Sequence, residues 1–126
     1  MERARRRAAD RRARADETSR AYDVFLDRLA IPLFRQIANV LRAENHLFTV
    51  FTPGGSVRLM SDRGAQDYIE LTLNAGGDET AVAGHTSRSR GGRVIETERP
   101  IGDPATLTDE DVLVFVLKEL EPFVER

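Results

Sequence analysis

The sequence predicts an α+β fold in which a helix, a five-stranded antiparallel meander and a second helix follow one another, with both helices packed on one face of the sheet. Three glycine pairs punctuate a β-rich middle region, at Gly54-Gly55, Gly76-Gly77 and Gly91-Gly92. Glycine adopts the positive φ that tight hairpin turns need. The short segments between the pairs leave no room for crossover helices, which take a dozen or more residues. Amphipathic helical patterns flank this region on both sides.

The N-terminal part predicts an Arg-rich arm followed by an amphipathic helix. Residues 1–15 contain only Met, Glu, Arg, Ala and Asp. Because they offer no apolar stripe wider than alanine, we expect them to form a solvated arm, separate from a single domain at 16–126. From residue 22 to 41 apolar side chains recur at three- and four-residue steps. Pro32 interrupts this stripe, so we expect the helix to kink there with Leu29 and Leu33 both buried.

Five segments in the middle of the chain have the composition of strands: 46–52, 56–61, 67–74, 80–89 and 93–101. If Gly91-Gly92 forms a two-residue turn, the residue numbers of cross-strand partners sum to a constant. This register pairs His85 with Glu98 and Ser87 with Glu96. It also places Arg88, Arg90, Arg93 and Arg99 together on the opposite face.

The last helix has a clear start and an unusually broad apolar surface. Thr108 is a good N-cap, and Asp109, Glu110 and Asp111 follow it in the first turn, where carboxylates favour the positive helix end. The apolar run 112–117 is too broad for a helix that is covered on one side only. We therefore expect the sheet and either the first helix or a second subunit to cover it. The side chains expected at such a subunit interface are Tyr22, Phe25, Leu26, Phe34, Leu113 and Phe115.

Length and composition restrict the class of protein. The chain of 126 residues is long enough for one domain, and it contains no cysteine, which excludes disulfides, thiolate nucleophiles and Cys-ligated zinc. No apolar run approaches the ~20 residues that a membrane span requires, and the start lacks the apolar core of a secretory signal. These features predict a cytoplasmic protein with no membrane partner.

Charge is distributed unevenly along the chain. Residues 1–42 carry eleven Arg against six acidic residues, whereas residues 96–126 carry nine acidic residues against three bases. Arginines in the arm and in the 88–93 hairpin are candidate contacts to phosphates. Against this interpretation, no aromatic residue lies nearby to stack a base, and the pI of about 5.7 is acidic. The candidate anion-binding residues are Arg5, Arg6, Arg7, Arg11, Arg12, Arg88, Arg90 and Arg93.

Few residues suggest catalysis or metal binding. His46 and His85 are the only histidines, and their spacing matches no metal motif. Ser87, His85 and a neighbouring Glu are the parts of a nucleophilic site. No nucleophile elbow or oxyanion loop accompanies them, so an ordinary cross-strand pair is the simpler interpretation. The sequence predicts no catalytic residue, no metal and no cofactor.

The order of one helix, five antiparallel strands and one helix resembles the frataxin-like arrangement at the level of topology. The acid-rich first helix of that family is absent here, so the resemblance implies no site residue and no iron chemistry.

The sequence favours a non-catalytic interaction or scaffolding module, either a homodimer or a subunit of a larger assembly. Its partner would be another protein or a second copy of the chain. One alternative is a nucleic-acid-binding accessory protein that uses the Arg-rich arm and the 88–93 hairpin. Another is a small enzyme or ligand binder working between sheet and helices, for which the sequence offers no convergent set of catalytic residues.

Overall fold

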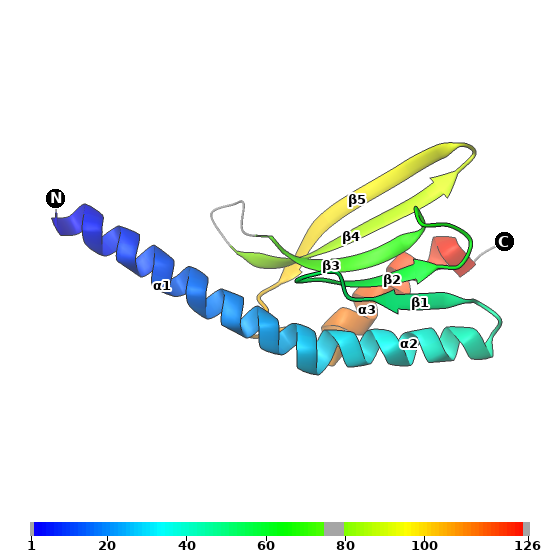
Figure 1. Cartoon of the computed structure of the whole chain (residues 1–126), viewed down its shortest axis with the longest axis horizontal. Helices are drawn as coiled ribbons and strands as arrows, with labels where there is room; N and C mark the ends of the chain where they lie inside the picture. Colours follow the sequence, from blue (N-terminus) through cyan, green and yellow to red (C-terminus); the bar gives the residue numbers. More distant parts are fainter. Residues whose placement is uncertain (1, 75–79, 125–126) are drawn as a thin grey trace.

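A long N-terminal helix, five antiparallel strands and a C-terminal helix make up the protein (Figure 1). This computed structural model describes residues 2–74 and 80–124, and the predicted turn at Gly76-Gly77 lies outside them. The α+β class predicted from the sequence is confirmed. The elements are α1 (Glu2–Phe25), the π-helical segment η1 (Leu26–Ala30), α2 (Ile31–Ala43), β1 (Phe48–Phe51), β2 (Val57–Ser61), β3 (Tyr68–Asn74), β4 (Ala81–Arg90), β5 (Arg93–Gly102) and α3 (Asp109–Val124).

The strands form one sheet in the order β1-β2-β3-β4-β5, so every neighbour in the chain is also a neighbour in the sheet. The predicted register of the last hairpin is confirmed, because His85 lies opposite Glu98 and Ser87 opposite Glu96. Gly91 and Gly92 have φ values of 59° and 79°. Two positive φ values are what a two-residue type I′ turn requires.

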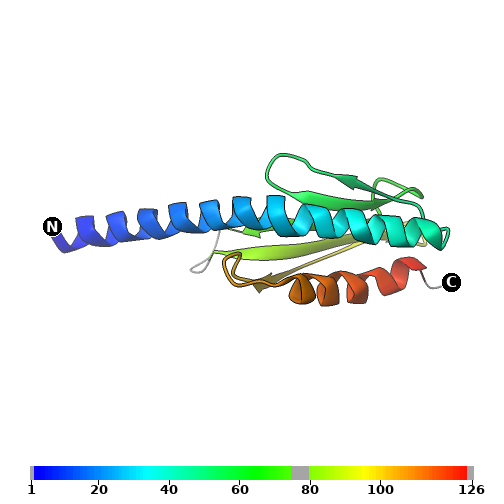
Figure 2. The same ribbon diagram turned by 90° about the horizontal axis from the view of Figure 1, so that it is seen from below.

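Helices α2 and α3 cover the same side of the sheet and lie next to each other (Figure 2). Helix α2 lies against β1 and β2, and α3 lies against β3 and β4. Alternate strand residues point toward them, including Leu59, Ile69 and Leu71, which are fully buried with Phe34 and Val116 of the helices. Strand β5 is different, since all its residues from 93 to 100 are exposed.

The predicted bend at Pro32 is confirmed, and η1 accounts for it. Proline lacks the N–H that would bond the carbonyl four residues back, and its ring crowds that carbonyl. The helical turn before Pro32 is wider than in an α-helix. The Ile31 N–H donates to the Leu26 carbonyl, five residues earlier, as in a π-bulge. Figure 1 shows the helix axis changing direction at this point. Leu29 and Leu33 pack against the core but remain half-buried, so their predicted burial is only partly met.

The predicted N-cap of α3 is also confirmed. The Asp111 N–H donates to Thr108 Oγ1 at 3.2 Å, while the Thr108 N–H donates to Asp111 Oδ2 at 3.0 Å. This reciprocal pair is a capping box in which Asp replaces the usual Glu or Gln. It fixes the residue at which α3 starts.

Candidate functional site

The Arg-rich arm is a helix that extends beyond the sheet. Residues 2–20 belong to α1, and their side chains are exposed apart from Ala8 and Thr18, which are half-buried. This exposed segment is longer than the arm predicted at residues 1–15; it is called the arm below, and it carries eight Arg and four acidic residues. Burial begins at Tyr22, where the helix reaches the sheet. The candidate residues Arg5, Arg6, Arg7, Arg11 and Arg12 are therefore all open to a partner.

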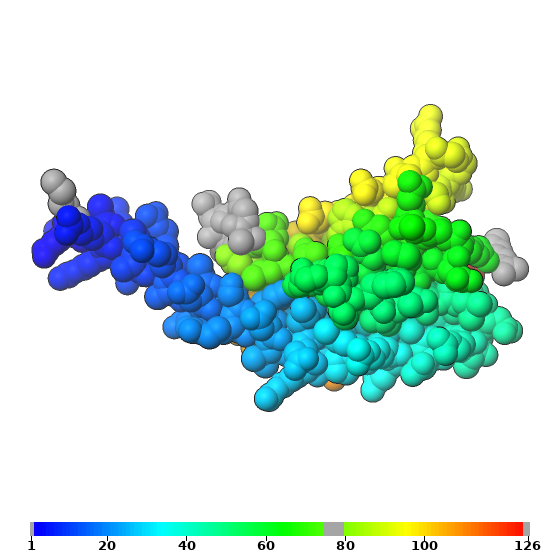
Figure 3. Space-filling view, in the orientation of Figure 1, coloured from blue at the N-terminus to red at the C-terminus, as the bar shows by residue number. Residues whose placement is uncertain are grey.

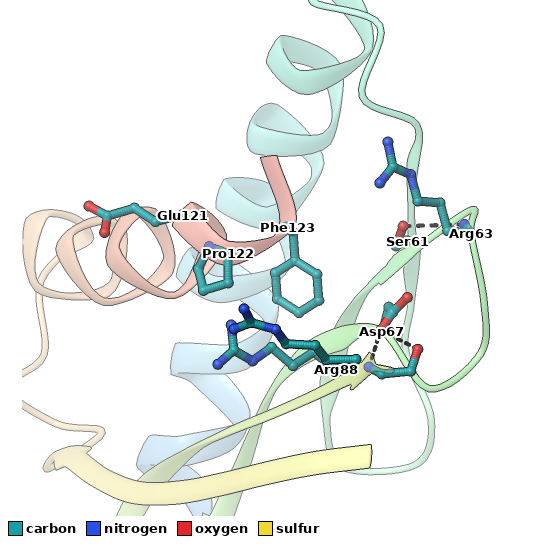
Figure 4. Close-up of a pocket in the computed structure, with 9 residues that line it drawn as sticks. Ser61, Arg63, Asp67, Arg88, Glu121, Pro122 and Phe123 are labelled. Atoms are coloured by element: carbon teal, nitrogen blue, oxygen red, sulfur yellow. Dashed lines mark hydrogen bonds between the residues drawn. The ribbon is translucent and has the colours of Figure 1, made fainter. Parts of the chain in front are cut away.

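A hollow of about 520 Å³ lies between the β4–β5 hairpin and the end of α3 (Figure 4). Arg88 and Arg90 line it, and Arg88 extends toward Phe123. Asp67 and Glu121 line the same hollow, and Asp67 accepts hydrogen bonds from the N–H and hydroxyl of Ser89 at 2.7 and 3.1 Å. Carboxylates disfavour a bound phosphate, and the negative end of α3 favours cations. Arg63 lines the hollow as well, so three arginines share it with two carboxylates and its lining is of mixed charge.

The structure does not bring the two basic features together. The arm projects from one end of the molecule, and the tip of the β4–β5 hairpin with Arg93 projects from the other (Figure 3). Arg99 also leaves the predicted patch, because it pairs with Glu119 of α3 at 2.9 Å and lies over the Phe115 ring.

A polar network covers the sheet face that the helices leave open. Arg58 pairs with Glu70 at 3.0 Å and lies 4.0 Å above the centre of the Tyr68 ring, and Tyr68 stacks on His85. His85 lies directly opposite Glu98, its predicted partner, but its Nε2 is 3.7 Å from the carboxylate of Glu96, which lies diagonally across from His85. These contacts connect strands β2 to β5, so the network stabilises the sheet through cross-strand pairs.

Ser87 is a poor nucleophile in this position. It lies on the same face as His85, but only 2 % of its surface is exposed, so a substrate at the surface cannot reach its hydroxyl. The sequence had grouped Ser87, His85 and Glu96 correctly from the hairpin register. It missed Arg58 and Tyr68, because the six-residue connection between β2 and β3 does not fix a register as a two-residue turn does.

Most side chains expected at a subunit interface are instead buried within the chain. Tyr22, Phe25, Phe34 and Phe115 belong to the hydrophobic core, and each is at most 5 % exposed. Leu26 and Leu113 are half-buried beside it. These residues already pack against the sheet, so a contact between subunits would have to use other side chains.

Part of the exposed apolar surface lies on the outer side of α3, although Val40 of α2 and Phe51 of β1 are also exposed, at 63 % and 45 %. Val114 and Leu117 are 61 % and 52 % exposed, although they belong to the predicted apolar run. A groove of about 620 Å³ separates this side of α3 from the end of β5, where Pro100 and Ile101 line it. Glu110 also lines the groove. The breadth of the apolar run was the sequence signal for this surface, but the sequence could not tell which of its residues would remain outside.

Metal binding and membrane insertion find no support in the part of the chain that the structure describes. Over residues 2–74 and 80–124, no three His, Asp or Glu side chains converge as a metal site would need, and no helix is both long and apolar enough to span a bilayer. His46 lies in the connection after α2, where its N–H donates to the Leu41 carbonyl at 2.8 Å.

Comparison with known proteins identifies no relative. No protein-family model matches the chain, and neither the curated proteins nor the solved structures include a significant match.

Proposed function

We propose that this protein is a non-catalytic interaction or scaffolding module of the cytoplasm, and that it works as a homodimer. The observation that carries the proposal is the uncovered surface formed by β5 and the outer side of α3. A helix is about 10 Å across and neighbouring strands are about 4.8 Å apart, so two helices cover about four strands. The fifth strand is left without a covering helix.

The uncovered surface has the composition of an interface. Ile95 of β5 is 37 % exposed on the helix side of the sheet, opposite Arg88, and Val114 and Leu117 of α3 are more exposed still. Val94 is 44 % exposed but points to the open face of the sheet, opposite Ser89. Larger contiguous patches of exposed apolar surface mark interaction sites on soluble proteins, and Val114 lines one groove together with Pro100 and Ile101. An edge strand also presents unpaired backbone groups that can accept another chain. The open sheet face supports a non-catalytic role, because its polar side chains bind one another across the strands.

The first prediction concerns the oligomeric state. Multi-angle light scattering at tens of micromolar is expected to give a dimer, twice the 14.1 kDa of one chain. The double variant Val114→Lys/Leu117→Lys is expected to be monomeric, because two buried charges at an interface are costly to desolvate. Val40→Lys on α2 is the matched control, since Val40 is equally exposed at 63 %. A wild-type protein that is a strict monomer at this concentration would contradict the proposal.

Nucleic-acid binding by the arm alone is the second candidate. The observation that favours it is the exposure of every arginine in residues 2–14. Contacts to phosphates release counterions, so affinity must fall steeply with salt. If four or five of these arginines engage, the slope of log affinity against log salt is about −4 on duplex DNA and about −3 on a single strand.

Fluorescence anisotropy with a short labelled oligonucleotide tests this candidate at two salt concentrations. Removing residues 2–14 is expected to abolish most of the slope and leave the fold intact, because none of these residues is buried. Arg88→Ala/Arg90→Ala is expected to leave the slope unchanged, since the hairpin lies at the other end of the molecule. Equal binding by the full-length and truncated proteins would rule out the arm as a nucleic-acid site.

A further inference from the structure

We infer that the arm of each subunit docks along the outer side of α3 of a second copy, against the stripe formed by Glu110, Val114, Leu117 and Glu121. The inference rests on the proposed homodimer and names its two contact surfaces. Each subunit offers one arm and one stripe, so a two-fold dimer makes the same contact twice.

The arm lacks the packing that normally stabilises a helix. Helices in proteins gain most of their stability from burying an apolar face. Yet the arm is helical over residues 2–20 with nearly all its side chains exposed. At 1.5 Å per residue it is about 28 Å long, which is close to the roughly 24 Å of α3. Its own chain covers the arm only in part, since Arg14 and Thr18 line an open hollow with Pro100. Docking on α3 would cover the side chains that this contact leaves exposed.

The stripe on α3 is a continuous helical face. Its four residues are spaced at i, i+4, i+7 and i+11, which places them on one side of the helix. Val114 and Leu117 are the exposed apolar pair at its centre. Glu110 and Glu121 are exposed at its two ends. The groove beside β5 continues this face, with Pro100 and Ile101 on its far wall.

Complementary charge indicates that the arm is the segment that docks on the stripe of α3. The arm has twice as many arginines as acidic residues, whereas α3 carries five acidic residues and one base, Lys118. Complementary charges at the rim of an interface steer association and fix its register. The long apolar stems of arginine can also cover the apolar pair while their guanidinium groups reach the carboxylates at either end. An acidic partner such as a nucleic acid would satisfy the arm but would leave Val114 and Leu117 exposed.

A charge-swap experiment on the full-length protein tests the inference. One variant makes the arm acidic (Arg7→Glu/Arg11→Glu/Arg14→Glu), and the other makes the stripe basic (Glu110→Arg/Glu121→Arg). All five residues are exposed, so circular dichroism should show both variants folded. Each variant alone is expected to raise the dimer Kd in sedimentation velocity at least about tenfold. An equimolar mixture is expected to dimerise again, because both contacts of the mixed dimer are complementary.

The control is Glu44→Arg/Asp62→Arg, which makes the same charge change as the stripe variant at exposed sites outside α3 and the arm. It is expected to keep the wild-type Kd. A wild-type dimer whose Kd neither charge variant changes would overturn the docking inference and leave the homodimer proposal standing. Folded variants that dissociate but fail to pair when mixed would also overturn it. A monomeric wild type would overturn both.

Discussion

Replacing Gly84 with alanine is expected to lower the free energy of unfolding by about 2–3 kcal/mol, the cost of overpacking a core. A Cβ atom at Gly84 would lie 2.2 Å from Cζ of Phe115 and less than 3 Å from two further ring atoms. Phe115 is 5 % exposed and packs directly on the backbone of β4. Urea unfolding followed by circular dichroism measures the loss.

The ring of Phe115 cannot easily move away from an added methyl group. Arg99 is the cross-strand partner of Gly84, and its guanidinium lies 5.1 Å from the centre of the ring while it pairs with Glu119. Gly54→Ala is the matched control, because a Cβ there meets nothing within 4 Å. Phe115→Leu should reduce the cost of Gly84→Ala, since contacting residues are not additive. If Gly84→Ala and Gly54→Ala were equally stable, this account of the packing would be wrong.

Local signals in the sequence were sufficient to predict the elements and one register. The strand ends lie within one or two residues of the prediction, because turn residues and alternation are properties of neighbouring residues. The β4–β5 register followed from Gly91-Gly92, since a two-residue turn fixes every pair behind it. Thr108 and Asp111 predicted the start of α3, because a helix cap is also formed by residues close together in the sequence.

Contacts between distant elements could not be predicted in this way. The approach of Phe115 to Gly84 depends on where α3 crosses β4, and no residue near Gly84 encodes that crossing. The sequence likewise gave no sign that the two basic segments would lie at opposite ends, or that Arg99 would pair with α3.

For the candidate interface, too, the sequence predicted local features but not contacts between distant elements. The breadth of the apolar run 112–117 predicted surplus apolar surface on the last helix, but it did not separate core residues such as Phe115 from residues left outside. Large aromatic side chains are the ones that a small core buries first. Val114 stays outside because a groove separates this side of α3 from β5, and Leu117 is exposed beside it on the outer side of the helix.

Raising the pH from 10 to 12 is expected to cost the protein about 2 kcal/mol of stability through Tyr22 alone. Burial, followed by the negative charges of Glu70 and Asp23, raises the pKa of Tyr22 to about 12 from the usual 10.0. The neutral phenol is held in the fold, where it donates to the Gly55 carbonyl at 2.6 Å. Below pH 10 the Tyr22 phenol keeps its proton in both the folded and the unfolded protein, so its full contribution to the free energy of unfolding is present. Between pH 10 and 12 the phenol ionises in the unfolded protein but not in the folded one. The free energy of unfolding therefore falls over this range.

Tyr22→Phe separates this effect from the other groups that titrate at high pH. At neutral pH the variant is expected to be less stable than the wild type by about 1 kcal/mol, the net value of one hydrogen bond. Phenylalanine cannot ionise, so the difference should shrink above pH 10 and reverse as pH approaches 12. Urea unfolding of both proteins across this range measures the crossover. A stability difference that stayed constant from neutral pH to pH 12 would show that the Tyr22 hydroxyl is not held in its neutral form.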